Sequence, residues 1–247
     1  MQISGKVVLI TGAAGGIGKA LVQEALANDA NTVEACDRSA DALAAVARLN
    51  PQRIRTHVLD VTNETAVTQL AEKCPQTEIL INCHGVVVHE SYLEAGTIDA
   101  FRSEMEINYW GQVLMCRAFA PIVSKSGGGA IANFLSPLAY ITFPFTAAYC
   151  ATKAACRVLT EAMRAELSPK GTLVMAVFPG AIDTQMMTNL DIPKSPPGVV
   201  AKAVMKGIVA DEKEVWAGAS AEDMRLRLRD DPEAFKAEAA LWLRLKV

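Results

Sequence analysis

Tyr149 and Lys153 stand four residues apart in the segment Ala-Ala-Tyr-Cys-Ala-Thr-Lys-Ala-Ala. On a helix, residues i and i+4 share a face, so an ammonium group would lie one turn from a phenol. A nearby positive charge favours the phenolate, and we therefore expect the pKa of Tyr149 to fall below its usual value of about 10. A phenol tuned in this way can donate and accept protons at neutral pH. Because Tyr-x-x-x-Lys is common by chance, other motifs in the chain must decide whether the pair is catalytic.

A glycine-rich turn is one such accompanying motif. Thr11-Gly12-Ala13-Ala14-Gly15-Gly16-Ile17-Gly18 follows a strand-like run and opens a helical pattern. Glycines allow a tight turn and a close approach of the backbone to a pyrophosphate, which binds at a helix N-terminus where free N–H groups point outward. Glycines also occur in ordinary turns, but the position between a strand and a helix is the one that a dinucleotide site requires.

An acidic residue at the end of the next strand indicates which dinucleotide binds. Asp37 lies 19 residues beyond Gly18, where a carboxylate can accept hydrogen bonds from ribose hydroxyls and repel a 2′-phosphate. This favours NAD over NADP. Arg38 is adjacent and could pair with a 2′-phosphate, so NADP stays open as the alternative.

The elements that must position these residues alternate between strands and helices. Such an alternation is typical of a parallel sheet covered by helices on both faces, and near-continuous apolar strands fit burial on both sides. We expect strands at Lys6 to Thr11, Thr32 to Cys36, Arg53 to Leu59, Glu78 to Cys83, Ala130 to Leu135, Leu173 to Phe178 and Glu214 to Ala217. We expect helices at Gly16 to Asn28, Ala40 to Arg48, Glu64 to Lys73, Ile98 to Ser124, Thr146 to Leu167 and Val199 to Ala210.

Composition excludes several classes of partner. The 247 residues are 51% hydrophobic and carry a net charge of −3, so no basic excess is present to neutralise nucleic acid. No apolar run is long enough to predict a membrane span. Six cysteines without a Cys-x-x-Cys pair, and no leader before the first strand, predict reduced thiols in a cytoplasmic protein. The spacing of the cysteines does not support redox or metal chemistry. The three histidines also lack the spacing of metal ligands, and we expect no metal site.

With these residues in view, the chain resembles the short-chain dehydrogenase/reductase family, in its shorter single-domain branch. The resemblance covers about residues 4 to 218 and implies a doubly wound, Rossmann-type sheet of about seven strands in the order 3-2-1-4-5-6-7. Ser136 lies 13 residues before Tyr149, as in the family. The positions that match its cofactor-binding residues are Gly12, Gly16, Ile17, Gly18, Asp37, Asp60, Val61, Asn82, Gly85, Tyr149, Lys153, Pro179, Gly180 and Thr184.

The resemblance also implies a mechanism. Asn108, Ser136, Tyr149 and Lys153 match the family's catalytic tetrad. Tyr149 would be the general acid/base, and Lys153 would lower its pKa and hydrogen-bond the nicotinamide ribose. Ser136 would hydrogen-bond the substrate oxygen, and Asn108 would hold a water that connects Lys153 to solvent. The implied reaction is interconversion of an alcohol and a ketone with NAD(H).

Two departures from the family pattern limit what it implies about the substrate. Cys83-His84 replaces the usual Asn-Ala, and a short loop at about 185–197 with an added tail replaces the common reductase ending. The apolar, aromatic segment from Pro137 to Phe145 should border the substrate, because ligands bind beyond the carboxyl ends of the strands. It favours a small or medium-sized, apolar alcohol or ketone.

Two alternatives, the domain organisation and the assembly complete the interpretation. The same residues allow a dinucleotide-binding regulator without activity, although loss of Ser136, Tyr149 or Lys153 would have favoured it and all three are present. Gly12, Gly15 and Gly18 also fit the longer sugar-nucleotide branch, which needs a larger substrate domain. We expect one domain over residues 1–247, with a helical tail at 219–247 packed on it or on a neighbouring subunit. The long helices should form a homo-oligomer, a dimer or tetramer.

Overall fold

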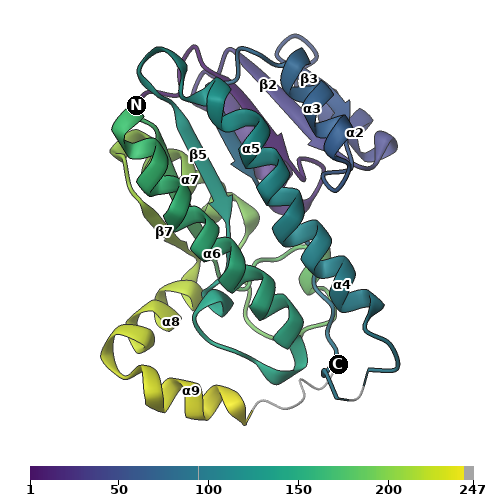
Figure 1. The fold of residues 1–247 in the computed structure, drawn as a ribbon, viewed down its shortest axis with the longest axis vertical. Coiled ribbons are helices and arrows are strands. Elements are labelled where there is room, and N and C mark those ends of the chain that lie inside the picture. The colour runs from purple at the N-terminus through teal and green to yellow at the C-terminus, as the bar shows by residue number, and fades with distance from the viewer. Residues whose placement is uncertain (94, 242–247) are drawn as a thin grey trace.

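Seven strands form one parallel sheet in the order β3-β2-β1-β4-β5-β6-β7 (Figure 1). The structure is a computed structural model in which residues 1–93 and 95–241 are described. The order confirms the predicted doubly wound topology, since the chain runs from β1 to one edge and returns to the centre at β4. The strands are β1 Val7–Thr11, β2 Thr32–Asp37, β3 Ile54–Val58, β4 Ile79–Asn82, β5 Ala130–Phe134, β6 Leu173–Pro179 and β7 Glu214–Ala217.

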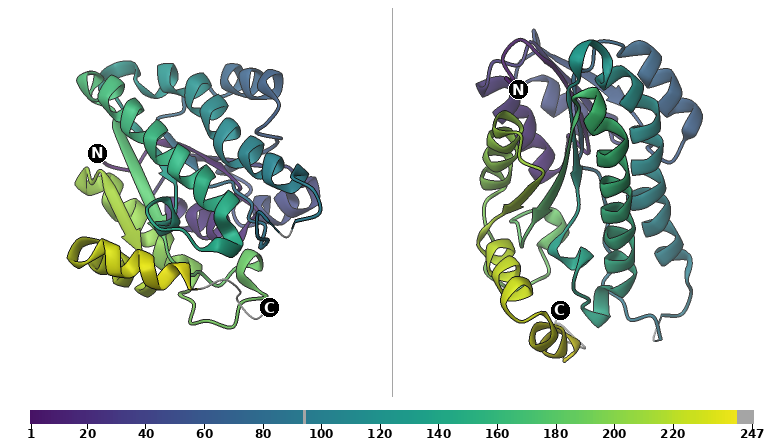
Figure 2. Two further views of the ribbon diagram at one scale, coloured as in Figure 1. Left: turned by 60° about the horizontal axis from the view of Figure 1, so that its bottom comes forward. Right: turned by 60° about the vertical axis from the view of Figure 1, so that its left-hand side comes forward.

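Helices cover both faces of the sheet, as the edge-on view in Figure 2 shows. In β1, Val8 and Ile10 pack into a core shared with α1, α2 and α7, whereas Leu9 packs into a second core with α3 and α5. This is why the strands read as continuous apolar runs. The helices are α1 Gly16–Ala27, α2 Ala40–Ala47, α3 Glu64–Lys73, α4 Asp99–Met105, α5 Gly111–Val123, α6 Ala147–Leu167, α7 Pro197–Ala210, α8 Ala219–Asp230 and α9 Pro232–Ala240.

The predicted helix from Ile98 to Ser124 is interrupted by one π-helical stretch, Glu106–Trp110, which joins α4 to α5. A π-helical turn widens the backbone spiral and is frequent at functional sites. Asn108 lies in its middle. Among the described residues, no helix is both long and apolar enough to cross a membrane.

The tail forms two helices that return to the sheet's carboxyl edge (Figure 1). Asp231 ends α8 and caps α9, because its side chain accepts a hydrogen bond from the main-chain nitrogen of Ala234. Phe235 and Ala239 of α9 are buried against Ile141, Phe143 and Phe145. Phe235 and Ala239 therefore pack this part of the predicted tail against the Ile141–Phe145 segment, and Trp242 and Leu245 lie outside the described residues.

Candidate active site

A cavity of about 1700 Å³ lies along the carboxyl edge of the sheet. Its lining joins the glycine turn at one end to the tyrosine helix α6 and the tail at the other. The volume exceeds the roughly 300–1,000 Å³ of a pocket for one small molecule, so there is room for a dinucleotide and a substrate. Of the predicted site residues, those that line it are Gly12, Gly16, Ile17, Gly18, Asp37, Asp60, Val61, Gly85, Ser136, Tyr149, Lys153, Pro179, Gly180 and Thr184.

The glycine turn has the close backbone packing that the sequence predicted. Gly12 has a φ of +65°, which favours glycine. A Cβ on Gly18 would lie 2.0 Å from the carbonyl oxygen of Gly12. Helix α1 begins after Gly15, which has no side chain to cap the first turn, so its N–H groups are available to an anion. The turn therefore fits a pyrophosphate.

Asp37 ends β2 at the wall of the same cavity. Its carboxylate accepts hydrogen bonds from the main-chain nitrogens of Ala14, at 3.1 Å, and Ser39, at 3.2 Å. These bonds hold the carboxylate beside the glycine turn. Arg38 and Asp60 line the cavity nearby, and hydrogen bonds from Thr62 hold the pKa of Asp60 below its usual value. An anion at Asp37 and a cation at Arg38 thus both border the expected adenosine end.

Cys83 and His84, where the chain departs from the family pattern, keep the turn after β4 close to the glycine turn. The hydroxyl of Thr11 accepts a hydrogen bond from the Cys83 nitrogen and lies 2.7 Å from Nδ1 of His84. Burial lowers the pKa of His84 to about 3, so its ring is neutral at physiological pH. His84 therefore adds no positive charge to the cavity.

Tyr149 and Ser136 both line the cavity wall. Burial raises the pKa of Tyr149, and a hydrogen bond with Ser136 lowers it by less. The expectation that the pKa of Tyr149 falls below about 10 is wrong for the chain as described, because desolvation disfavours the phenolate more than its surroundings favour it. The phenol is protonated at neutral pH.

Lys153 is buried behind the tyrosine ring. Its ammonium group lies 5.5 Å from the ring centroid and donates a hydrogen bond of 2.8 Å to the main-chain oxygen of Phe134, at the end of β5. Burial lowers the pKa of Lys153. The i, i+4 spacing does place both groups on one face of α6, but the ammonium approaches the ring and a carbonyl rather than the hydroxyl.

Asn108 does not line the cavity. Its side-chain oxygen accepts a hydrogen bond from the Val86 nitrogen, and its amide nitrogen donates to the Val86 oxygen and to the hydroxyl of Thr152. The main-chain oxygen of Asn108 accepts a hydrogen bond from the thiol of Cys156 at 3.1 Å. Asn108 thus ties α6 and the π-helical turn to the segment after β4, and the predicted water site stays a proposal.

Asn82 also lies outside the cavity lining. Its side chain is buried at the end of β4, where its amide donates to the side-chain oxygen of Asn133 on β5 at 2.9 Å. Asn133 in turn donates to the hydroxyl of Thr160 on α6 at 3.0 Å. The side chain therefore links two strands and a helix beneath the site, and the predicted part of Asn82 in cofactor binding stays a proposal.

Two features of the site escaped the sequence prediction. Glu104 is fully buried, accepts a hydrogen bond from the Val88 nitrogen at 2.6 Å, and has its pKa raised to about 7 by burial. Phe235 of α9 lines the cavity, and the Arg227 side chain stacks on it with 4.0 Å between the guanidinium carbon and the ring centroid. The aromatic position in an amphipathic tail was the available signal for Phe235, and a carboxylate within an apolar helical pattern was the signal for Glu104.

The part of the cavity lined by the Pro137–Phe145 segment and the tail is mostly apolar. The predicted bordering segment contributes Pro137, Leu138, Phe143 and Phe145, as expected. The loop after β6 and the tail add further large side chains, namely Met186, Met187, Leu190, Ile192, Met224 and Phe235. Polar groups in this part include His89, Asp223 and Arg227.

Comparison with known proteins identifies the family to which this architecture belongs. The family model described as short chain dehydrogenase matches residues 6–194. The chain belongs to this family. The match spans the glycine turn, the Ser136–Tyr149–Lys153 group and the segment after β6, and it ends before the tail that closes the cavity.

Curated relatives of this short-chain dehydrogenase act on several substrates. The NAD-dependent glycerol dehydrogenase of Listeria innocua is 30% identical, with 91% of this chain and 79% of that protein covered. The 2-(R)-hydroxypropyl-CoM dehydrogenase of Xanthobacter autotrophicus is 31% identical, with 87% of this chain and 92% of that protein covered.

Solved structures in the family share the whole fold. A short chain dehydrogenase from Burkholderia cenocepacia in complex with NADP is 36% identical, with a TM-score of 0.90 and coverage of 97% of this chain and 99% of that one. The 3-ketoacyl-(acyl-carrier-protein) reductase from Brucella melitensis complexed with NADH is 25% identical, with a TM-score of 0.80 and coverage of 85% and 93%. The short-chain dehydrogenases therefore include users of either cofactor.

Proposed function

We propose that this short-chain dehydrogenase interconverts an alcohol and a ketone by hydride transfer with NAD(H), with Tyr149 as the general acid/base. The observation that supports this most directly is the placement of Ser136, Tyr149 and Lys153 on one wall of a cavity whose other end is the glycine turn. The bound nicotinamide would carry the hydride, and the protein would supply geometry and electrostatics.

The chain's own residues favour a defined proton path. Since burial keeps the Tyr149 phenol protonated, the hydroxyl can donate its proton to an oxygen on which negative charge develops. Ser136, hydrogen-bonded to Tyr149, would stabilise the same oxygen. Lys153 would hold positive charge beneath the ring, which offsets the phenolate left after donation. The protonated phenol is the form that ketone reduction needs.

The proposed cofactor preference is for NAD(H). The Asp37 carboxylate, fixed by Ala14 and Ser39, would accept ribose hydroxyls and repel a 2′-phosphate. The competing group is Arg38. Asp37→Ser should raise kcat/KM for NADPH relative to NADH by on the order of tenfold or more, because removing the charge leaves Arg38 unopposed. Equal efficiency of the unaltered enzyme with both cofactors contradicts the preference.

The proposed substrate is an apolar alcohol or ketone, as the methionine and phenylalanine side chains around the substrate end suggest. Phe235→Ala should raise KM for an aromatic or long-chain ketone and leave KM for NADH unchanged. Val199→Ala, on an exposed side chain outside the cavity lining, is the control. A preference for a polyol such as glycerol over apolar ketones contradicts this part of the proposal.

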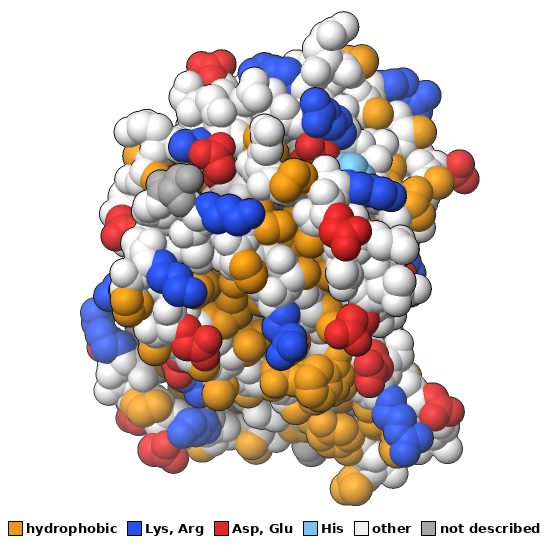
Figure 3. Space-filling model, turned by 45° about the horizontal axis from the view of Figure 1, so that its top comes forward, with side chains coloured by type: hydrophobic (Ala, Val, Ile, Leu, Met, Phe, Trp, Pro, Cys, Tyr) orange, Lys and Arg blue, Asp and Glu red, His pale blue; other side chains and the backbone are white. Residues whose placement is uncertain are grey.

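We also propose a homo-oligomer that uses the faces of α5 and α6. Figure 3 shows hydrophobic side chains gathered in the middle of the face that carries these helices. Trp110, in the π-helical turn just before α5, and Val158, on α6, are 47% and 56% exposed. Contiguous apolar surface of this kind marks interaction sites. Light scattering should give a dimer or tetramer, which Trp110→Glu with Val158→Glu should dissociate; a monomeric mass for the unaltered protein contradicts it.

The proposed location is the cytoplasm. All six cysteines are free, and five of them are buried. Disulfides are rare where thiols are kept reduced, so free cysteines support a reducing compartment. Fractionation of the source cells, with antibody detection of this chain, tests the location.

The deciding experiment is NADH oxidation by the purified protein across a panel of ketones, diketones and steroids. Turnover of apolar ketones that depends on Ser136 and Tyr149 is the expected result. Tight NADH binding without turnover of any member would instead support the dinucleotide-binding regulator. The panel therefore separates the enzyme from the regulator without knowledge of the natural substrate.

A further inference from the structure

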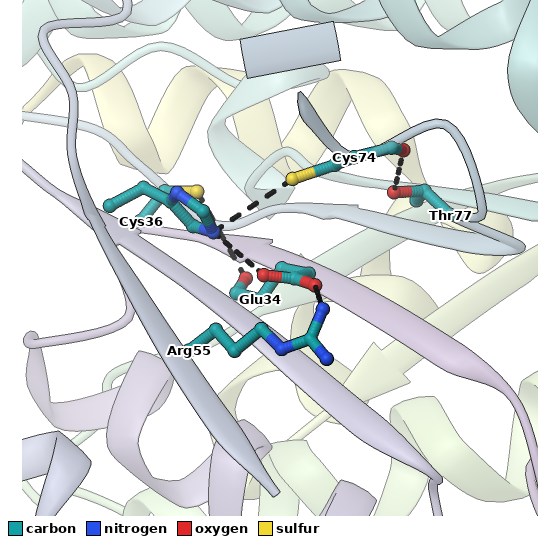
Figure 4. A network of polar contacts seen from close by, with 6 residues as sticks. Glu34, Cys36, Arg55, Cys74 and Thr77 are labelled. Atoms are coloured by element: carbon teal, nitrogen blue, oxygen red, sulfur yellow. Dashed lines mark hydrogen bonds and ion pairs between the residues drawn. The ribbon is translucent and has the colours of Figure 1, made fainter. Parts of the chain in front are cut away.

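Three metal-ligating side chains from separate elements meet beneath the outer strands of the sheet, outside the cavity lining. They are Glu34 of β2, His57 of β3 and Cys74, which ends α3. One potential ligand atom of each lies within 4.8 Å of the others. Figure 4 shows the Cys74 sulfur and the Glu34 carboxylate approaching the same space from different elements. Their distance in sequence explains why spacing alone predicted no metal site.

Hydrogen bonds do not satisfy this group completely. Nε2 of His57 lies 2.6 Å from a carboxylate oxygen of Glu34 and 3.8 Å from Sγ of Cys74. That nitrogen carries at most one proton, so if it donates to Glu34 it offers the thiol no acceptor. If it instead accepts the thiol proton, the buried Glu34 carboxylate loses its donor from His57. A cation between the three atoms would satisfy all of them.

We propose that Glu34, His57 and Cys74 bind one divalent transition-metal ion, Zn²⁺ in the first instance. Thiolate, imidazole and carboxylate are the ligands that zinc takes, and ligand atoms around a tetrahedral zinc lie about 3.3–3.8 Å apart. The 3.8 Å between Sγ and Nε2 already fits, and the Glu34 oxygen must move outward by less than about 1 Å. The thiolate and the carboxylate balance the charge of the ion.

The surroundings allow the ion to reach the three side chains. They also provide room for a further ligand on the ion. The His57 side chain is 23% exposed, so solvent reaches one side of the group and can supply a water ligand. Arg55 is the competing cation: its guanidinium lies 3.5 Å from Glu34, and its side chain is 72% exposed, so it can withdraw. None of the three ligands lines the active-site cavity, and the bound ion should therefore stabilise the fold rather than change turnover.

Binding must release a proton. Zinc binds the thiolate rather than the thiol, so the Cys74 proton passes to the buffer when sulfur ligates the ion.

The test titrates the chelator-stripped full chain with Co²⁺ and then with Zn²⁺. We expect one Co²⁺ to bind per chain and to give a near-ultraviolet charge-transfer band from thiolate to cobalt. The band should disappear as Zn²⁺ displaces Co²⁺. The Tm of the protein should be higher with Zn²⁺ than without it. Cys74→Ala should remove the band and weaken binding at least as much as the 10- to 100-fold typical of losing an outer-shell partner. Arg55→Gln should tighten binding.

Cys36→Ala is the matched control, because Cys36 is a buried thiol on β2 that is not one of the three ligands. It should leave affinity and stoichiometry unchanged. His57→Gln, at a partly exposed position, repeats the test should Cys74→Ala fail to fold. Absence of stoichiometric binding, absence of the thiolate band, or binding that both Cys74→Ala and His57→Gln leave intact overturns the proposal.

Discussion

Asn108 holds the main chain of Val86 through both ends of its amide, with the Val86 nitrogen 2.8 Å from Oδ1 and the Val86 oxygen 2.9 Å from Nδ2. Val86 belongs to the segment after β4 that lines the cavity. Because the amide also donates to Thr152 on α6, one side chain fixes the cofactor wall relative to the tyrosine helix. The π-helical turn places Asn108 where it can do so.

Asn108→Ala should destabilise the fold by about 1–3 kcal/mol, because the partly buried N–H and C=O of Val86 lose their partners. It should also lower kcat, since the wall beside Lys153 loosens. Urea unfolding and steady-state kinetics measure the two effects. Thr152→Val is the control, because it removes the bonds of the Thr152 hydroxyl to Asn108 and to the Tyr149 main-chain oxygen but keeps both bonds to Val86, and it should cost less stability. Equal losses in the two variants contradict this role of Asn108.

Gly18→Ala should weaken NADH binding by at least about tenfold, because the new Cβ would lie 2.0 Å from the Gly12 oxygen and force the turn to shift. NADH fluorescence titration measures the affinity. Gly96→Ala is the matched control, since a Cβ there meets no heavy atom within 4 Å. An unchanged affinity in Gly18→Ala shows that the turn does not bind the cofactor as proposed.

Glu104 predicts a pH dependence of stability. Burial raises its pKa from the usual 4.5 to about 7. Below about pH 4.5 the folded and unfolded chains both hold the proton, and between that pH and about 7 only the unfolded chain releases it. The stability that Glu104 contributes is therefore full at low pH and is lost, by up to about 3 kcal/mol, as pH rises through 7.

Glu104→Gln should flatten the fall in unfolding free energy between pH 5 and pH 8, as measured by urea denaturation. Glu106→Gln, at an exposed carboxylate on the adjoining turn, should leave the pH dependence as it is. If the unfolding free energy of Glu104→Gln falls with pH as steeply as that of the unaltered protein, this prediction is wrong.

Local patterns in the sequence predicted the strands, and the ordered motifs of the family resemblance predicted their order and fourteen of the residues that line the cavity. The Pro137–Phe145 segment could be placed at the cavity, since the carboxyl ends of parallel strands share one edge. The π-helical interruption at Asn108 could not be predicted, because the residues around it continue a helical pattern and only packing selects the wider turn.

What the sequence could not supply depends on burial and on contacts between distant elements. The pKa of Tyr149 rises rather than falls because spacing reveals the neighbouring Lys153 but not the desolvation of the phenol. The direction of the Lys153 ammonium, toward the Phe134 oxygen, depends on β5. The meeting of Glu34 with Cys74 likewise depends on how α3 packs beneath β2.

The central claim is that Tyr149 transfers the proton, and Tyr149→Phe tests it most directly. The variant keeps the ring and its packing but loses the hydroxyl that Ser136 contacts. Turnover and NADH binding should be measured in parallel on a ketone that the unaltered enzyme reduces. The account predicts a fall in kcat of at least about 10²-fold with the Kd for NADH nearly unchanged. Substantial remaining turnover at an unchanged Kd contradicts it.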